Sequence, residues 1–90
     1  METGTIVLST AGRDSGRVFC VVDGSEDNFA LIADGRLRRL ETAKRKKHKH
    51  LKRLGESPRL AELLKTGALT NKLLRQELAH FLENANKAEG

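Results

Sequence analysis

Residues 4–23 read GTIVLSTAGRDSGRVFCVVD, and they decide the fold of the N-terminal half of this chain. The first apolar run, residues 5–9, is rich in β-branched residues and predicts a strand. The second run, residues 17–23, is apolar on both alternations, which predicts a strand covered on both faces. Between them, TAGRDSG at residues 10–16 has the glycines and the aspartate of a loop.

Two further strands are expected downstream. Residues 28–33, NFALIA, predict a third strand, and residues 36–40, RLRRL, predict a fourth. Asp34-Gly35 between them predicts a hairpin with a type I′ turn, in which both central residues take positive φ. Four short strands joined by short turns favour a tightly curled antiparallel sheet that hides its own edges, and a small barrel is the most economical form of such a sheet.

The hydrophobic period becomes helical in the C-terminal third. Ser57-Pro58 is typical of an N-cap followed by proline at the first helical position, and Gly67 is expected to end that helix. A second helix is expected from Thr70, with apolar residues at helical spacing. Neither helix is long enough to be stable alone, so each should pack on the other, on the barrel or on a partner.

The chain is therefore expected to be mainly β with an α appendage. Residues 1–54 should form the barrel, including a basic extension at residues 41–54. Residues 55–90 should form a helical hairpin whose last residues, 87–90, are frayed. A chain of 90 residues has room for one small core.

The positive charge is concentrated in one segment. Residues 36–53 contain ten Lys or Arg and one acid, a net charge of +9, whereas the rest of the chain has seven basic and eleven acidic residues, a net charge of −4. Such a stripe indicates a polyanionic partner. Its centre, KRKKHKHLKR at residues 44–53, could instead be a solvated tail. Because it follows RLRRL directly, we expect the basic surface to begin on a folded strand and run off its end, mobile until a partner binds.

Three parts of the chain resemble one family. Residues 4–23 resemble the KOW motif of ribosomal proteins and transcription elongation factors, with Gly12 at the hallmark glycine and Gly16 at the second glycine. Residues 31–54, LIADGRLRRLETAKRKKHKHLKRL, are similar to the continuation in small bacterial KOW-domain proteins akin to large-subunit ribosomal proteins of archaea and eukaryotes. Residues 63–78, LLKTGALTNKLLRQEL, resemble their C-terminal tail.

The resemblance implies an SH3-like (KOW) barrel and RNA binding. The sequence departs from the family at Thr42-Ala43, where the pattern has a proline before the lysines. Residues of the glycine loop, the hairpin and the basic segment are expected to contact RNA: Gly12, Arg13, Arg17, Arg36, Arg38, Arg39, Lys44, Arg45, Lys46, Lys47, His48, Lys49, His50, Lys52 and Arg53. Phe19 and Phe29 are expected in the core, and Trp and Tyr are absent. Recognition should therefore depend on shape and charge more than on base identity.

These features predict a non-catalytic, ribosome-associated module that binds structured RNA in translation. The alternative is a protein-interaction module of the transcription or translation machinery, which would contact its partner through the C-terminal helices at Leu60, Leu64, Leu78 or Phe81.

No paired acid and base groups and no cofactor loop indicate an enzyme. His48 and His50 have no cysteine or carboxylate at ligand spacing, so neither a metal nor a cofactor is expected. Cys20, in a strand expected to be buried, should pack in the core.

The remaining expectations concern location and assembly. One cysteine cannot form an internal disulfide, and METGTIVLST lacks the features of a signal peptide, so a cytoplasmic protein is expected. No apolar run approaches the ~20 residues that span a bilayer, so membrane insertion is not expected. The chain is expected to be a monomer.

Overall fold

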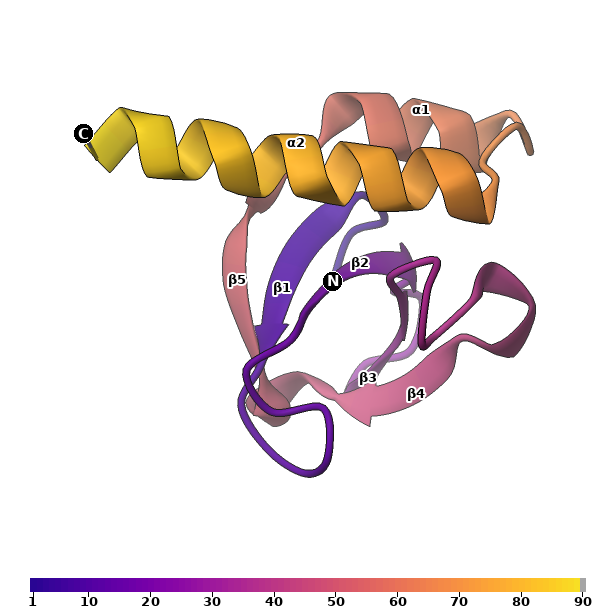
Figure 1. The fold of residues 1–90 in the computed structure, drawn as a ribbon. Coiled ribbons are helices and arrows are strands. Elements are labelled where there is room, and N and C mark those ends of the chain that lie inside the picture. The colour runs from indigo at the N-terminus through magenta and orange to yellow at the C-terminus, as the bar shows by residue number, and fades with distance from the viewer. Residues whose placement is uncertain (90) are drawn as a thin grey trace.

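A computed structural model describes the backbone of residues 1–89 and the side chains of residues 1–85. Five strands form one antiparallel sheet: β1 (Thr5–Ser9), β2 (Val18–Asp23), β3 (Phe29–Ala33), β4 (Lys44–Lys47) and β5 (Leu51–Glu56). Their order in the sheet is β4-β3-β2-β1-β5, so the consecutive strands β4 and β5 lie at opposite edges. A one-turn 3-10 helix, η2 (His48–His50), joins these two edges, and the sheet is strongly curled (Figure 1).

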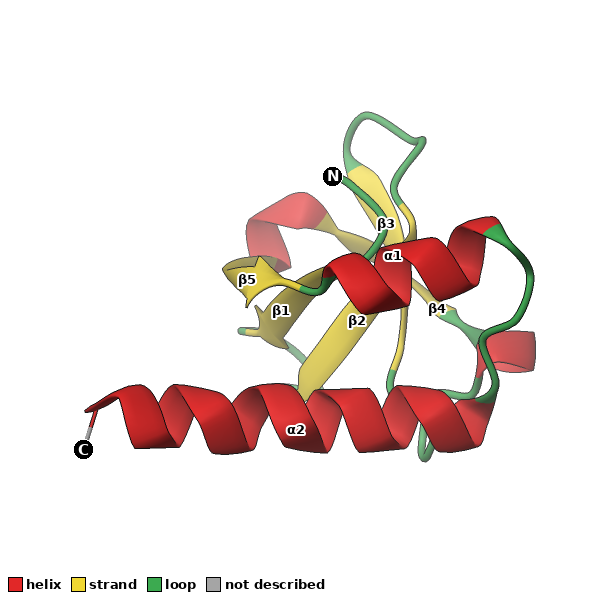
Figure 2. Cartoon of the chain, turned by 90° about the horizontal axis from the view of Figure 1, so that it is seen from above, coloured by secondary structure: helices red, strands yellow, loops and turns green. Residues whose placement is uncertain are grey.

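Two helices, α1 (Pro58–Lys65) and α2 (Asn71–Glu89), lie on one side of the sheet (Figures 1 and 2). Ser57 caps α1 as predicted, because its Oγ accepts a hydrogen bond of 3.2 Å from the Leu60 N–H. Gly67, at φ +72°, follows the end of α1 as predicted. Thr70 precedes α2 and accepts a hydrogen bond from the Leu73 N–H at its Oγ1. Within residues 1–89, neither helix is both long and apolar enough to cross a bilayer.

Two apolar clusters occupy the two faces of the sheet. Inside the curl lie Val7, Phe19, Val21, Ala30, Ile32 and Leu51. Between the sheet and the helices lie Ile6, Cys20 and Ala33, together with Leu60, Leu74 and Leu78. Because side chains alternate along a strand, β2 supplies residues to both clusters, which confirms that it is covered on both faces. Burial also raises the pKa of the Cys20 thiol to about 12.

The helix residues that the protein-interaction alternative needed are directed mainly inward. Leu60 is fully buried and Leu78 is 6% exposed, while Leu64 and Phe81 are half-buried and pack against the same cluster. The apolar faces of α1 and α2 therefore both pack on the same side of the sheet. The backbone of α2 continues to Glu89, through most of the segment expected to be frayed, and residue 90 lies outside the described residues.

The predicted fourth strand is wrong. Residues 35–38 form a bend and Leu40 begins a 3-10 turn, η1 (Leu40–Thr42), so the strand that pairs with β3 is β4, with Phe29 opposite Lys47. A type I′ turn needs positive φ at both central residues. Gly35 has φ +79°, but Asp34 does not have positive φ, because among the described residues only glycines do. The turn at Asp34-Gly35 is therefore not of type I′. Instead, Asp34 Oδ1 accepts hydrogen bonds from the backbone N–H groups of Arg36 and Arg38, both at 2.9 Å, which stabilise a longer turn.

The expectation of a mobile basic extension is also wrong. Residues 44–47 form the β4 edge of the sheet, and residues 51–56 form the β5 edge, paired with β1. Repulsion among the cations does not prevent this, because alternate side chains of β4 point to opposite sides and those on one side have partners.

Candidate nucleic-acid interface

The glycine loop, residues 10–17, connects β1 to β2 and is closed at its base by backbone hydrogen bonds. The Ser9 N–H donates to Arg17 O at 2.9 Å, and the Gly16 N–H donates to Ser9 O at 2.8 Å. Gly12 and Gly16 have φ of +77° and +87°, a conformation that glycine adopts without steric cost. Gly12 and Arg13 are exposed at the tip of the loop. The two glycines thus allow a tight loop that presents a cation and open backbone.

Asp14 ties this loop to the basic segment. The residue is 5% exposed, and its Oδ2 accepts hydrogen bonds from Lys44 Nζ at 2.8 Å and from Arg38 Nη2 at 3.3 Å. The hydrogen bond from Lys44 is the largest cause that lowers the pKa of Asp14 below its ordinary value of 3.8, against an opposing effect of burial. One carboxylate therefore compensates two of the predicted RNA-binding cations.

Lys46 is the second link between the loop and β4. It is 7% exposed, and its Nζ donates a hydrogen bond of 2.6 Å to Ala11 O. A buried ammonium requires such a partner, because its desolvation is otherwise costly. Lys44 and Lys46 lie two residues apart on β4 and both reach the loop, so they hold the fold together, and the buried Lys46 is not free to meet a phosphate in this arrangement.

Arg45 and Lys47 project from the other side of β4. The Arg45 guanidinium carbon lies 3.5 Å from the centroid of the Phe29 ring, and its Nε donates a hydrogen bond of 2.8 Å to Glu26 Oε2. Phe29 is half-buried beneath this cation, so the expectation that it lies in the core is wrong, whereas Phe19 is fully buried as expected. Lys47, opposite Phe29 in the ladder, is exposed.

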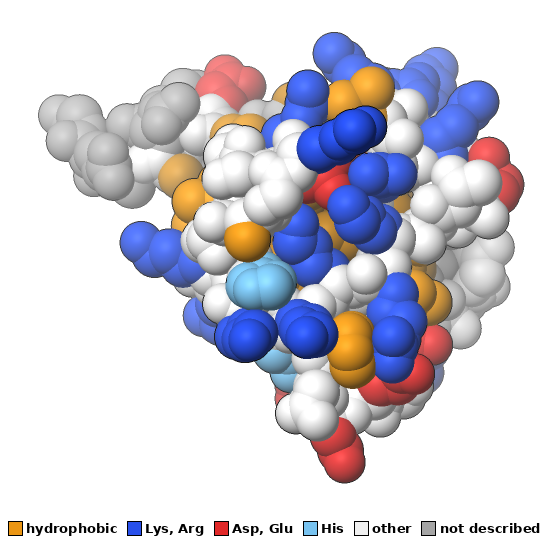
Figure 3. Space-filling model, turned by 90° about the horizontal axis from the view of Figure 1, so that it is seen from below, with side chains coloured by type: hydrophobic (Ala, Val, Ile, Leu, Met, Phe, Trp, Pro, Cys, Tyr) orange, Lys and Arg blue, Asp and Glu red, His pale blue; other side chains and the backbone are white. Residues whose placement is uncertain are grey.

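Six predicted cations are exposed and form no ion pair within the part of the chain that the structure describes: Arg13, Arg17, Arg36, Lys47, Lys49 and Lys52. All of these except Arg36 belong to the glycine loop, to η2 or to the adjoining ends of β4 and β5. In Figure 1 the glycine loop, η2 and the adjoining ends of β4 and β5 lie on the side of the sheet away from the helices. Figure 3 views that side and shows Lys and Arg side chains gathered across it, with His among them. We call this side the basic face.

Between β3 and β4, Arg38 reaches Asp14 in the glycine loop, but the other two arginines of this segment, Arg36 and Arg39, lie elsewhere. Arg75 Nη1 of α2 donates a hydrogen bond of 2.7 Å to Gly35 O, and Asn71 Oδ1 accepts one of 2.8 Å from the Leu40 N–H. Arg36 lines a hollow together with Arg75 of α2. Arg39 forms an ion pair of 3.8 Å with Glu41. The Glu41 carboxylate also accepts a hydrogen bond from Asn71 of α2. These two arginines therefore lie beside α2 rather than beside the glycine loop.

The two histidines and Arg53 complete the predicted set. His48 Nε2 lies 3.0 Å from Phe29 O, and the backbone carbonyl of His50 accepts a hydrogen bond of 2.9 Å from the Thr10 N–H. Both histidines are half-buried. Arg53 pairs at 3.6 Å with Glu56, and both side chains are largely exposed. Such a surface pair is weak, so Arg53 can exchange its carboxylate for a phosphate at little cost.

Sequence reasoning missed two features of this site. Asp14 was interpreted only as a loop residue. An acidic residue between Arg13 and Arg17 in a basic protein could also have been predicted to form an ion pair. The possibility that KRKK forms a strand was also missed. The two-residue period of a strand would have placed Lys44 and Lys46 on one side and Arg45 and Lys47 on the other.

Comparison with known proteins gives no match, either to a protein-family model or to a curated protein. The site is therefore interpreted from its own geometry. Among the described residues, no group of three His, Cys, Asp or Glu side chains is placed to hold a metal ion. What the geometry offers is a set of unpaired cations around a loop that is fixed to the sheet.

Proposed function

We propose that this protein is a non-catalytic RNA-binding module that holds structured RNA through phosphate contacts and acts in association with the ribosome. The observation that carries the proposal is the basic face, with its exposed cations Arg13, Arg17, Lys47, Lys49 and Lys52, none of which forms an ion pair among the described side chains. Like charges held close together repel one another, and a polyphosphate backbone relieves that repulsion while releasing its own counterions. RNA in particular, and the ribosome, follow from the family resemblance of the sequence.

The anchoring of the glycine loop supports the same proposal. Asp14 and Lys46 fix the loop to β4 before any ligand arrives, so little ordering is needed when Arg13 meets a phosphate. Gly12 at the exposed tip lets a phosphate approach the backbone N–H groups. A preformed loop of this kind suits recognition of RNA shape rather than of a flexible peptide.

We also propose that the curled sheet is an SH3-like barrel of the KOW class. Three features support this: the strand order, the glycine loop between β1 and β2, and the 3-10 turn that connects the two edge strands. In this fold the basic face would be formed by the loop and by the two edges of the barrel.

A salt titration with matched charge variants tests the proposal. The wild type, the basic-face variant Lys47→Ala/Lys49→Ala and the helix variant Lys65→Ala/Lys72→Ala are titrated with a fully paired RNA hairpin at several salt concentrations. Both variants lose two exposed lysines, but Lys65 and Lys72 lie on α1 and α2, away from the basic face. The basic-face variant should bind more weakly, with a slope of log affinity against log salt that is smaller by roughly 0.7 to 0.9 for each lost phosphate contact.

The helix variant should retain the slope of the wild type. Absence of RNA binding by the wild type would overturn the proposal. An equal loss in both variants would show that attraction depends on net charge alone, and the basic face would then have no special role.

A further inference from the structure

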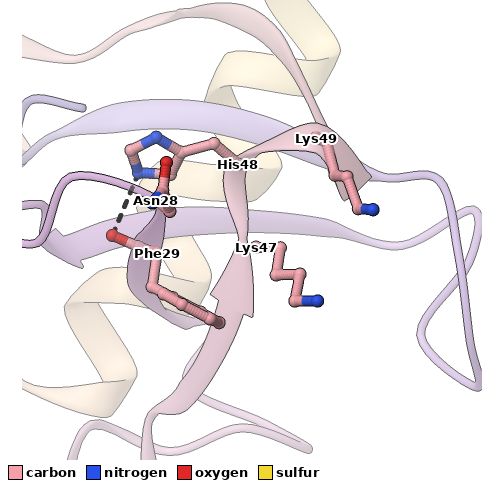
Figure 4. A pocket seen from close by; sticks show the side chains of 5 residues that line it. All are labelled: Asn28, Phe29, Lys47, His48 and Lys49. Atoms are coloured by element: carbon pink, nitrogen blue, oxygen red, sulfur yellow. Dashed lines mark hydrogen bonds between the residues drawn. The ribbon is translucent and has the colours of Figure 1, made fainter.

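We propose that the pocket where β3, β4 and η2 meet binds one unpaired nucleotide of an RNA strand, with the base against Phe29 and Asn28 and the adjoining phosphates on Lys47 and Lys49. This inference rests on the proposed RNA-binding function and adds a contact that depends on the base. The cavity measures about 530 Å³ and is lined by Asn28, Phe29, Lys47, His48 and Lys49 (Figure 4). Its volume is within the range of about 300 to 1,000 Å³ that is usual for ligand pockets.

Phe29 is the one phenylalanine ring, in a chain without Tyr or Trp, that is available to a ligand on the basic face. Of the three aromatic residues in the sequence, Phe19 is fully buried inside the curl and Phe81 packs on Gly55, where an added Cβ would lie 2.8 Å from its ring. Phe29 lines both this pocket and a neighbouring hollow that contains Arg45. Exposed ring surface beside unpaired cations is a feature of proteins that stack on unpaired bases.

The Arg45 guanidinium holds the Phe29 ring in place. It lies 3.5 Å from the ring centroid and is itself fixed by a hydrogen bond of 2.8 Å to Glu26. The ring is therefore oriented before a ligand binds, which reduces the entropy lost on binding. A guanidinium plane can also extend a stack of bases and rings.

Asn28 and His48 supply polar groups beside the ring. The His48 N–H donates a backbone hydrogen bond of 2.9 Å to Asn28 O, which holds the two residues together. His48 Nε2 lies 3.0 Å from Phe29 O, and because a carbonyl oxygen only accepts, Nε2 is the donor in this contact. The Asn28 side chain is exposed and has no hydrogen-bond partner within residues 1–85, so its amide can pair with the edge of a base.

Lys47 and Lys49 add the charge that selects a nucleotide over a neutral ligand. Both are exposed, and in Figure 4 both side chains extend to the same side of the pocket. Phosphates on either side of a bound base can reach such cations. A paired base cannot use this pocket, because its two faces are covered by neighbouring bases and its edge by its partner.

Three RNA hairpins with one common stem, each closed by a non-nucleotide linker so that no loop base is present, test the pocket: a fully paired hairpin, a hairpin with a one-nucleotide bulge, and a hairpin with an abasic residue at the bulge. We expect the wild type to bind the bulged hairpin roughly 10-fold more tightly than the paired one, within the range that stacking of one base on an aromatic ring provides. The abasic bulge retains the phosphate and lacks the base, so its affinity should be close to that of the paired hairpin.

Two variants and one control locate the contact. Phe29→Leu keeps an apolar side chain and removes the aromatic ring, so it should lose the preference for the bulge and keep its affinity for paired RNA. Asn28→Ala changes an exposed residue and should reduce the differences in affinity among bulges of A, C, G and U. Leu37→Ala, at a side chain 55% exposed in the bend before β4, should retain the full preference.

The outcomes separate this inference from the proposed function. Equal affinity of the wild type for paired and bulged RNA would overturn the proposed nucleotide pocket and leave the proposed phosphate binding intact. No binding to any hairpin would overturn both proposals. A full bulge preference in Phe29→Leu, with an unchanged melting temperature, would exclude stacking on this ring and overturn the inference.

Discussion

The two sides of β4 carry the same kinds of residue and make different contacts. On the loop side, Lys44 and Lys46 donate hydrogen bonds to Asp14 and Ala11; Lys46 is buried and Lys44 is half-buried. On the outer side, Arg45 covers Phe29 and Lys47 is exposed without an ion pair among the described side chains. The difference shows that the two-residue period of a strand decides which cations stabilise the fold and which remain for a ligand.

This difference changes how the basic segment should be tested. Replacing residues 44–47 together by alanine would remove both anchors of the glycine loop as well as an exposed cation. Stability and RNA affinity would then fall together, and neither result could be assigned to one side of β4. The two sides of β4 therefore need separate substitutions.

The largest effect is expected for Asp14→Ala, on the loop side. Without the carboxylate, Lys44 and Arg38, each with 34% of its side chain exposed, face one another without compensation. The free energy of unfolding should fall by about 2 kcal/mol, the cost typical of leaving polar partners unpaired. Urea unfolding measures this change in the free energy of unfolding. Glu26→Ala is the control on the outer side, where the pair with Arg45 is more than half exposed, and its effect should stay below about 0.5 kcal/mol.

The pH dependence of stability should reveal the same anchor. The pKa of Asp14 is lowered in the fold, mainly by the hydrogen bond from Lys44, so its contribution is fully present above the ordinary value of 3.8 and is lost as pH falls through the lowered value. Urea unfolding between pH 6 and pH 2 should show this loss in the wild type. Asp14→Asn should show a smaller decline below pH 4, and an identical decline in both proteins would contradict the assignment.

A smaller loss is expected for Lys46→Ala. The substitution removes the hydrogen bond to Ala11 O and leaves that carbonyl without this partner, which should reduce the free energy of unfolding by about 1 kcal/mol. The loop should also become more mobile, so amide hydrogen exchange at residues 10–16 should accelerate. Unchanged exchange in the loop would show that Lys46 is not an anchor.

The smallest effect on stability is expected for Lys47→Ala, on the outer side. Because the side chain is exposed and unpaired in the described structure, the free energy of unfolding should change by less than about 0.5 kcal/mol. RNA affinity should nevertheless fall, with a decrease of roughly 0.7 to 0.9 in the salt slope if one phosphate contact is lost. A destabilisation as large as that of Lys46→Ala would remove the distinction between the two sides.

Local sequence was enough to predict the elements whose signals are contained within a few neighbouring residues. The β-branched residues of 5–9 and the continuous apolar run of 17–23 predicted β1 and β2, and Ser57 and Gly67 marked the ends of α1. Burial of Cys20 followed from the apolar residues around it. In each case, short-range sterics and hydrogen bonding favour one conformation before the rest of the chain is considered.

The sequence by itself determined the strands β1 to β3, the two helices and the concentration of charge in residues 36–53. Only the tertiary structure decided that residues 44–47 pair with β3, that Asp14 and Lys46 fix the glycine loop, and that Phe29 lies under Arg45 rather than in the core. The physical reason is that a run of cations has no strong local preference. Its conformation is chosen by partners about 15 to 35 positions away in the chain, such as Phe29, Asp14 and Ala11, which only the fold brings together.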